Sequence, residues 1–153
     1  MFTDIVASTE QAARVGHRKW TTVTDDHDAM VRATLERHRG REVKTTGDGF
    51  LATFDATTRG VRAASEIVAG AKRMGLDVRA GVHVGEVEVR SSDVIGLPVS
   101  IAKRICDLAR PNQVLVSRTA SDLVAGSGIE FDDCDEHNLK GVPGTWRLFA
   151  VRG

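Results

Sequence analysis

The stretch that most constrains this chain runs from Val43 to Phe54, where two short β-prone runs meet at Gly47-Asp48-Gly49. Glycine on each side of Asp48 permits the positive φ values of a tight turn, and the flanking Val, Thr and Phe residues favour a half-buried, pleated surface. The stretch therefore predicts a β-hairpin with a carboxylate at its tip. Taken alone, Gly-Asp-Gly is more simply explained as ordinary turn chemistry than as a binding site.

A second carboxylate, Asp4, interrupts the β-prone run from Phe2 to Val6. Burying a lone carboxylate is costly unless a positive group compensates it. A divalent cation is one such group, and Mg²⁺ favours two carboxylates, backbone carbonyls and phosphate oxygens because it keeps several waters. The alternative is a strand-end acid that faces water. Asp4 and Asp48 together indicate a cation site, which neither indicates alone.

The bulk properties exclude several classes of protein. A length of 153 residues suits one domain, 1–153, and the strand that follows Met1 at once hints at a domain cut from a longer protein. No apolar run approaches the roughly 18 residues of a membrane span, and no signal peptide opens the chain. Lys plus Arg and Asp plus Glu both number 21, so no global field attracts nucleic acid or an acidic membrane. Cys106 and Cys134 match no zinc spacing, which predicts reduced thiols in a cytoplasmic protein.

The apolar periodicity predicts an alternation of strands and helices. We expect strands at 2–6, within 43–54 on both sides of the turn, at 78–84, 87–90, 113–116 and 146–151, and helices at 11–14, 18–39, 55–74, 97–108 and 117–124. Gly85 is expected to turn 78–84 into 87–90 as a second hairpin. This order contains the βαββαβ arrangement of ferredoxin-like folds. The predicted class is α+β, with a mainly antiparallel sheet, helices on one face and a C-terminal αβ extension.

Two further sets of polar residues have the chemistry of a nucleotide site. Four strand residues place Lys44 roughly 13 Å from Asp48. This distance implies that the two residues serve two sites or two subunits. The alternative is a strand lysine that is simply solvated. Ser100 and Arg104, at i and i+4 on a helix, lie opposite its apolar arc, and an arginine beside a hydroxyl can fork onto phosphate oxygens. The alternative for Arg104 is an ordinary exposed arginine.

The start of the first helix offers a third phosphate-binding feature. Free backbone amides at Ala7-Ser8-Thr9 are suited to hold a phosphate, and Ser8 and Thr9 are candidate N-caps. The chain has neither GxxxxGK[ST] nor GxGxxG, so P-loop and Rossmann sites are excluded. The five histidines show no metal-ligand spacing.

Together, Phe2–Thr9, Val43–Phe50 and Asp93–Gly96 with Arg104 resemble the class III nucleotidyl cyclase catalytic domain, the adenylate and guanylate cyclase family, in its bacterial, mycobacterial-type branch. The resemblance extends to Leu139–Gly144. It implies an adenylate cyclase, a lyase that forms 3′,5′-cyclic AMP and pyrophosphate from ATP with two Mg²⁺ or Mn²⁺ ions per site. It also implies a head-to-tail homodimer, in which each site takes its metal aspartates from one chain and its purine-reading residues and arginine from the other.

The resemblance assigns a role to each matching residue. Asp4, Asp48 and the carbonyl of Ile5 match the metal ligands. Lys44 and Asp93 match the pair that reads the purine, and their identities imply adenine, since Glu and a small residue would be expected for guanine. The remaining matches are Arg104 for the transition state, the amides of Val6, Ala7, Ser8 and Thr9 for phosphate, and Lys140 near a late phosphate-contacting lysine.

One position departs from the family pattern. Ser100 stands where the family has Asn or His, and its shorter hydroxyl is expected to reach the ribose or phosphate through water. Ser100 motivates one alternative to an adenylate cyclase, and a second alternative also stays open. The first is a weak or inactive cyclase-like module that binds nucleotide or dimerises, and the second is a guanylate cyclase, which Lys44 and Asp93 oppose.

Overall fold

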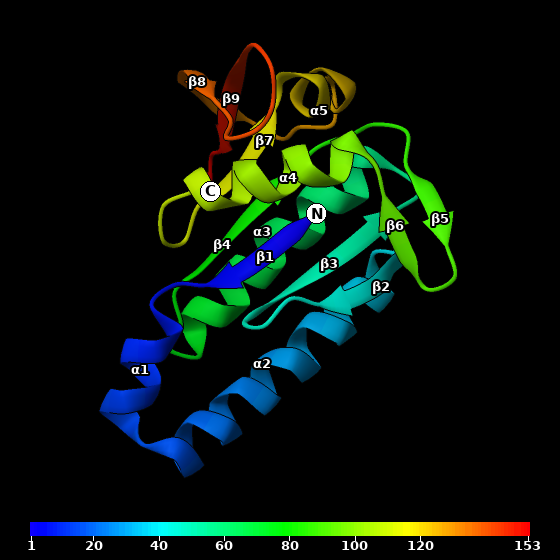
Figure 1. The fold of residues 1–153 in the computed structure, drawn as a ribbon. Helices are drawn as coiled ribbons and strands as arrows, with labels where there is room; N and C mark the ends of the chain where they lie inside the picture. The colour runs from blue at the N-terminus through cyan, green and yellow to red at the C-terminus, as the bar shows by residue number, and fades with distance from the viewer.

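A computed structural model describes residues 1–153, which form one seven-stranded sheet, a separate two-stranded hairpin and five helices (Figure 1). The elements are β1 (Phe2–Ile5), α1 (Ser8–Val15), α2 (His17–Arg37), β2 (Gly40–Thr45), β3 (Gly49–Phe54), α3 (Thr57–Arg73), β4 (Val78–Val82), β5 (Glu88–Arg90), β6 (Asp93–Ile95), α4 (Leu97–Leu108), β7 (Val114–Ser117), α5 (Arg118–Leu123), β8 (Phe131–Asn138) and β9 (Thr145–Val151).

The main sheet has the strand order β2-β3-β1-β4-β7-β9-β8. All neighbours are antiparallel except β4 and β7. Its first four strands, with α1 to α3, have the order of the ferredoxin-like βαββαβ unit. The predicted α+β class, the mainly antiparallel sheet and the C-terminal extension are therefore confirmed.

The helices cover both faces of the sheet, which corrects the expectation of one covered face. The largest core cluster joins α2 and α3 to one face, through residues such as Val31, Ile67 and Phe50. A second cluster lies on the opposite face, where Ala102 and Cys106 of α4 pack on Phe2 and Leu51. Consecutive strand residues point to opposite faces, so β1 contributes to both clusters. We call the side that bears α4 the α4 face.

Gly81 of β4 makes the close packing of α4 possible. A Cβ atom at this position would lie 2.4 Å from the backbone nitrogen of Cys106 and 2.7 Å from the carbonyl oxygen of Ala102. Backbone atoms cannot move aside as a flexible side chain can, so only glycine allows this approach. The helix that carries Ser100 and Arg104 is thereby fixed directly over the central strands.

Several element boundaries and pairings differ from the sequence expectation. β5 pairs with β6, not with β4, so the second hairpin is β5–β6 and stands apart from the main sheet (Figure 1). The helix expected at 18–39 ends at Arg37, because Arg39 takes a left-handed φ of 55° and Gly40 already begins β2. The strands β6 and β8 were not predicted. Ser117 does cap α5, since its hydroxyl accepts from the Ala120 amide at 3.2 Å.

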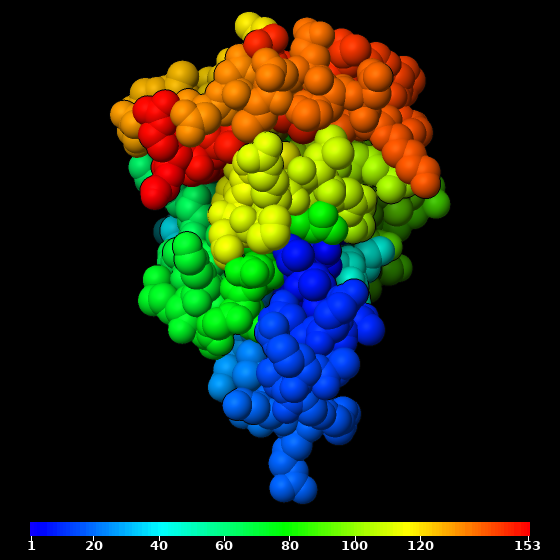
Figure 2. All heavy atoms as spheres, turned by 90° about the vertical axis from the view of Figure 1, so that its left-hand side faces the viewer, coloured from blue at the N-terminus to red at the C-terminus, as the bar shows by residue number.

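Helix α1 and the start of α2 project from the body of the molecule at the end opposite to β8 and β9, as Figure 2 shows in blue and in orange to red, whereas the rest of α2 packs on the sheet. None of the helices combines the length and the apolar character needed to cross a lipid bilayer.

Candidate active site

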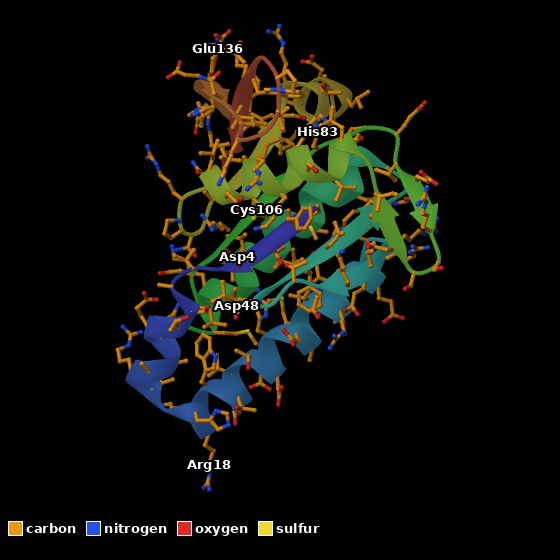
Figure 3. The ribbon with its side chains drawn as sticks, in the orientation of Figure 1. Asp4, Arg18, Asp48, His83, Cys106 and Glu136 are labelled. Atoms are coloured by element: carbon orange, nitrogen blue, oxygen red, sulfur yellow. The ribbon has the colours of Figure 1, made fainter.

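The β2–β3 turn brings Asp48 beside β1, the strand that carries Asp4 (Figure 3). Asp4 pairs with Gly49 in the antiparallel ladder, and the Ile5 amide donates to the Asp48 carbonyl at 3.2 Å. The tertiary structure therefore places the backbone of the turn residue Asp48 beside β1, next to the strand residue Asp4. That their carboxylates share a cation stays a prediction.

The two glycines of this turn serve different purposes. Gly47 has a φ of 70°, as the turn prediction requires. Gly49 does not adopt a positive φ; instead, a Cβ atom there would lie 1.7 Å from the carbonyl oxygen of Thr3. The second glycine is thus needed because β1 and β3 approach each other closely beside Asp48.

Each of the two carboxylates already has a polar partner in the chain. Asp4 Oδ2 accepts from Arg79 Nη2 at 3.0 Å and from Arg79 Nε at 3.3 Å. Asp48 Oδ2 accepts from the hydroxyl of Ser8. Arg79 is therefore the positive group that compensates the partly buried carboxylate of Asp4 within the chain, a role for which the sequence had suggested a divalent cation. The sequence pattern could have indicated this arginine. Arg79 stands between the buried residues Val78 and Ala80 of β4, so its side chain must point to the opposite side of the sheet, the α4 face.

The residues at this end of the sheet fit a divalent metal that arrives with a nucleotide. No group of three or more His, Cys, Asp or Glu side chains is arranged to hold a metal ion. Two carboxylates are too few for an all-protein cage, but Mg²⁺ usually binds to one or two carboxylates, waters and substrate phosphates. Asp4 Oδ1 takes part in none of the side-chain hydrogen bonds of the chain, so one oxygen of Asp4 stays available.

The start of α1 differs in detail from the predicted phosphate turn. Ala7 is the N-cap residue, in a left-handed conformation with φ of 52°, and no side chain caps the helix. The Ser8 hydroxyl goes to Asp48, so its predicted capping role is wrong. The Val6 amide donates to the Asp77 carbonyl at 2.8 Å and is not free. The first-turn amides of α1 from Ser8 onward have no acceptor within the helix, and they remain the candidates for phosphate binding.

Lys44 and Asp93 meet on the α4 face although 49 residues separate them in sequence. Lys44 Nζ donates to Asp93 Oδ2 at 3.1 Å, and the Val94 amide donates to Asp93 Oδ1 at 2.8 Å. The hydrogen bond from Lys44 is the largest cause that lowers the pKa of the Asp93 carboxyl below its ordinary value, followed by the bond from the Val94 amide. Asp93 is therefore held as an ionised acceptor, beside a cationic donor.

The Lys44–Asp93 pair lies away from the two aspartates of the same chain. Lys44 is opposite Leu51, which is opposite Phe2, two residues before Asp4. Two strand spacings and two residues place Lys44 roughly 10 Å sideways and 7 Å along the sheet from Asp4. The ladder register thus places Lys44 well beyond hydrogen-bonding distance of Asp4, and the prediction that Lys44 and Asp48 serve different sites stays a prediction.

Helix α4 presents Ser100 and Arg104 on its outer side, as the helical wheel predicted. Ile101, Ala102, Ile105 and Cys106 are buried, whereas Ser100 is exposed. Arg104 is 40% exposed, and its nearest carboxylate, Asp107, lies 3.5 Å away, which is a weak contact. The guanidinium is free to turn toward an anion. Lys140 is exposed and forms no ion pair, and its phosphate role stays a prediction.

None of these residues lies in an enclosed cavity. A cavity of about 280 Å³ opens between the ends of β3 and β4 and the start of α4, lined by residues such as Leu51, His83 and Pro98, and it includes no candidate site residue. The charged groups that suit a nucleotide all lie outside this cavity, on the surface of the chain. Both groups of candidate residues, Asp4 with Asp48 and Lys44 with Asp93, therefore lie on open surface.

The class of protein follows from the comparison with known families, which places this fold among the nucleotide cyclase catalytic domains. The family model described as the adenylate and guanylate cyclase catalytic domain matches residues 1–153. The chain belongs to this family.

Individual relatives agree with this assignment. The chain is 34% identical over 114 residues to a putative adenylate cyclase 3 of Rhizobium meliloti, and the match covers 69% of this chain and 19% of that protein. The chain thus spans only about a fifth of that relative.

Solved structures share the fold. Adenylate cyclases of Trypanosoma brucei in their monomeric state match with a TM-score of 0.89 and 22% identity, over 98% of this chain and 85% of theirs. The catalytic core of a rhodopsin-guanylyl cyclase with converted specificity, in complex with ATPαS, matches with a TM-score of 0.88 and 21% identity, over 99% of this chain and 92% of that one.

Proposed function

We propose that this chain is the catalytic domain of an adenylate cyclase, which converts ATP into 3′,5′-cyclic AMP and pyrophosphate at sites shared between two chains of a homodimer. The observation that carries the proposal is the contact between Lys44 and Asp93. The Watson–Crick edge of adenine presents an amino donor beside a ring-nitrogen acceptor. An ionised Asp93 accepts from the former, and Lys44 donates to the latter.

Guanine has the opposite requirement at this edge, because it presents a carbonyl acceptor and N–H donors. If Asp93 and Lys44 kept the positions that suit adenine, Asp93 would face the guanine carbonyl, acceptor against acceptor, and Lys44 would face the ring N–H, donor against donor. Mismatched hydrogen bonds of this kind discriminate strongly between substrates. The pair therefore favours adenylate over guanylate cyclisation.

The chain's own residues would act as follows. Asp4, Asp48 and the Ile5 carbonyl would hold the divalent ions, which when bound acidify the ribose 3′-hydroxyl and neutralise the triphosphate. The free amides at the start of α1 would bind phosphate oxygens. Arg104 of the second chain would donate to the oxygens on which charge develops as the 3′-hydroxyl attacks the α-phosphorus in line. No side chain of the site is placed as a general base, so the proton leaves through water or substrate.

Exposed apolar residues support the pairing of two chains. Val89, Ile95 and Leu97 are 58%, 38% and 55% exposed, and all lie on the β5–β6 hairpin or at the start of α4. Ile95 lies on the same face of the hairpin as Asp93, whereas Val89 lies on the opposite face with Val94. A partner that contacted Ile95 would therefore also approach the purine-reading pair, and exposed apolar side chains next to polar site residues are typical of an interaction surface.

The test is the assay of purified protein with Mn²⁺ or Mg²⁺ and either ATP or GTP, with the cyclic product quantified by chromatography. We expect cyclic AMP from ATP, and a loss of at least about 100-fold in Asp48→Ala, because that variant lacks a metal carboxylate. Absence of cyclic AMP at every metal, nucleotide and protein concentration would refute the proposal for this domain.

The second candidate is a cyclase-like module that binds nucleotide without turning it over. Ser100 favours it, because this exposed hydroxyl stands where the family has a longer Asn or His side chain. Calorimetric binding of a non-hydrolysable ATP analogue by a protein that makes no cyclic AMP would select this alternative. Ser100→Asn would then be expected to gain turnover.

A further inference from the structure

Arg79 makes an asymmetric contact with the metal-site residue Asp4. The two side chains face each other from directly paired positions of β4 and β1. Two of the three donor nitrogens of Arg79, Nε at 3.3 Å and Nη2 at 3.0 Å, donate to the same oxygen, Oδ2. The other oxygen, Oδ1, is left without a hydrogen bond. Arg79 thus fixes the orientation of Asp4 while one oxygen remains free for a metal.

The third donor of Arg79 binds the helix that carries Arg104. Arg79 Nη1 donates to the carbonyl oxygen of Asp107 at 2.7 Å, near the C-terminal end of α4. A cation at the carbonyl end of a helix is favoured electrostatically. The side chain of Asp107 in turn lies 2.7 Å from Lys103 Nζ and 3.5 Å from Arg104 Nη1. One arginine therefore ties the Asp4 carboxylate to the end of α4.

The charge of Arg79 also changes what the aspartates offer to a metal. Asp4 and Asp48 together carry two negative charges, and Arg79 reduces the net charge of this group to about minus one. A unit positive charge about 6 Å from a dication in a water-like dielectric lowers the affinity for that dication by roughly tenfold. Both side chains are only about one-quarter exposed, at 26% for Arg79 and 25% for Asp4, so solvent does not remove this effect entirely.

We propose that Arg79 is a positioning residue and the resident counter-charge of Asp4. It holds the carboxylate in its metal-binding orientation, and it keeps the affinity of the nucleotide-free chain for divalent metal low, so that the metal enters mainly with the triphosphate. The four negative charges of a triphosphate restore the attraction that Arg79 removes. This inference rests on the proposed function for the identity of the metal site.

The test measures Mn²⁺ binding to nucleotide-free protein, by the electron paramagnetic resonance signal of free Mn²⁺ and by calorimetry. Arg79→Gln is expected to bind Mn²⁺ about tenfold more tightly than wild type, because the opposing charge is gone. Arg79→Lys, which keeps the charge, is expected to retain the wild-type affinity. Both variants are expected to lose turnover at saturating metal, because neither reproduces the bridge from Asp4 to the Asp107 carbonyl.

A purely structural role for Arg79 predicts a different outcome, with turnover and folding impaired and Mn²⁺ affinity unchanged or lower. That result in Arg79→Gln would overturn the inference. Arg59→Gln is the matched control, because it removes another arginine paired with an aspartate, Asp55, at 2.8 Å, and its Mn²⁺ affinity is expected to equal that of wild type. If Arg79→Gln folds poorly by circular dichroism, Arg79→Met provides the same measurement with a neutral chain of similar length.

The measurement separates this inference from the proposed function. Tighter Mn²⁺ binding by Arg79→Gln in a protein that makes no cyclic AMP would refute the cyclase activity and support the role of Arg79. Normal cyclic AMP production by wild type, with no gain of affinity in Arg79→Gln, would refute the role of Arg79 alone. Asp4→Asn must abolish the difference between the Arg79 variants, because it removes the carboxylate on which Arg79 acts.

Discussion

Lys44 Nζ and Asp93 Oδ2 lie 3.1 Å apart and join β2 to the β5–β6 hairpin on the open part of the α4 face. Both side chains remain about half exposed, at 50% and 42%, so the pair adds little to stability. The contact instead fixes the orientation of each side chain, which the proposed function requires of a pair that reads a purine.

The first prediction concerns the ionisation of Asp93. Lys44 lowers the pKa of this carboxyl below its ordinary value, so the pair is fully formed above the ordinary aspartate pKa and is lost only as the pH falls through the lowered one. Lys44→Ala is expected to raise the pKa of Asp93 back toward the ordinary value. Carboxyl-carbon NMR titration of wild type and variant checks the direction, and an unchanged Asp93 titration would contradict the contact.

The second prediction concerns the choice of base. Lys44→Glu combined with Asp93→Ser replaces the donor by an acceptor and removes the acceptor, so we expect the ratio of kcat/KM for ATP to that for GTP to fall by at least about 100-fold. Competition assays with both nucleotides measure this ratio. The control is Arg41→Glu, a charge change at an exposed position of the same strand, which should leave the ratio as in wild type.

The third prediction concerns the shared site. Lys44→Ala and Asp48→Ala are each expected to be inactive, and an equal mixture is expected to recover about a quarter of wild-type activity, because half of the dimers are mixed and each has one intact site. Adding Val89→Asp to both chains places a charge on the exposed hairpin and should abolish the recovery. Mixed dimers that form, as judged by mass spectrometry, but never turn over ATP would refute the two-chain site.

The fourth prediction concerns the two thiols. Burial of Cys106 between α4 and the sheet raises its pKa to about 12, so at pH 8 only about one molecule in ten thousand carries the thiolate that reacts. Cys134 is partly exposed. A chromogenic disulfide reagent should therefore modify one thiol per folded chain and two after denaturation. Rapid reaction of Cys106, identified with Cys134→Ser, would show that α4 is not packed on the sheet.

Much of the fold follows from local sequence. The hairpin around Gly47-Asp48-Gly49 and the amphipathic pattern of α4 each predicted their element because turn chemistry and helical periodicity act over a few residues. The strand β8 was missed because its sequence, Phe131–Asn138, is mostly acidic and polar with no alternation. Its strand conformation comes from pairing with β9, which is a non-local interaction.

The candidate site, too, could be predicted from the sequence only in part. The sequence by itself determined which residue types are present: two strand-borne aspartates, a strand lysine and an arginine on the polar side of a helix. Only the tertiary structure decided their partners, since the face that α4 covers, the pairing of β5 with β6 and the meeting of Asp4 with Arg79 all depend on strand register. Strand register pairs residues that are tens of positions apart in the chain. No local sequence pattern specifies this register when both faces of a sheet are buried.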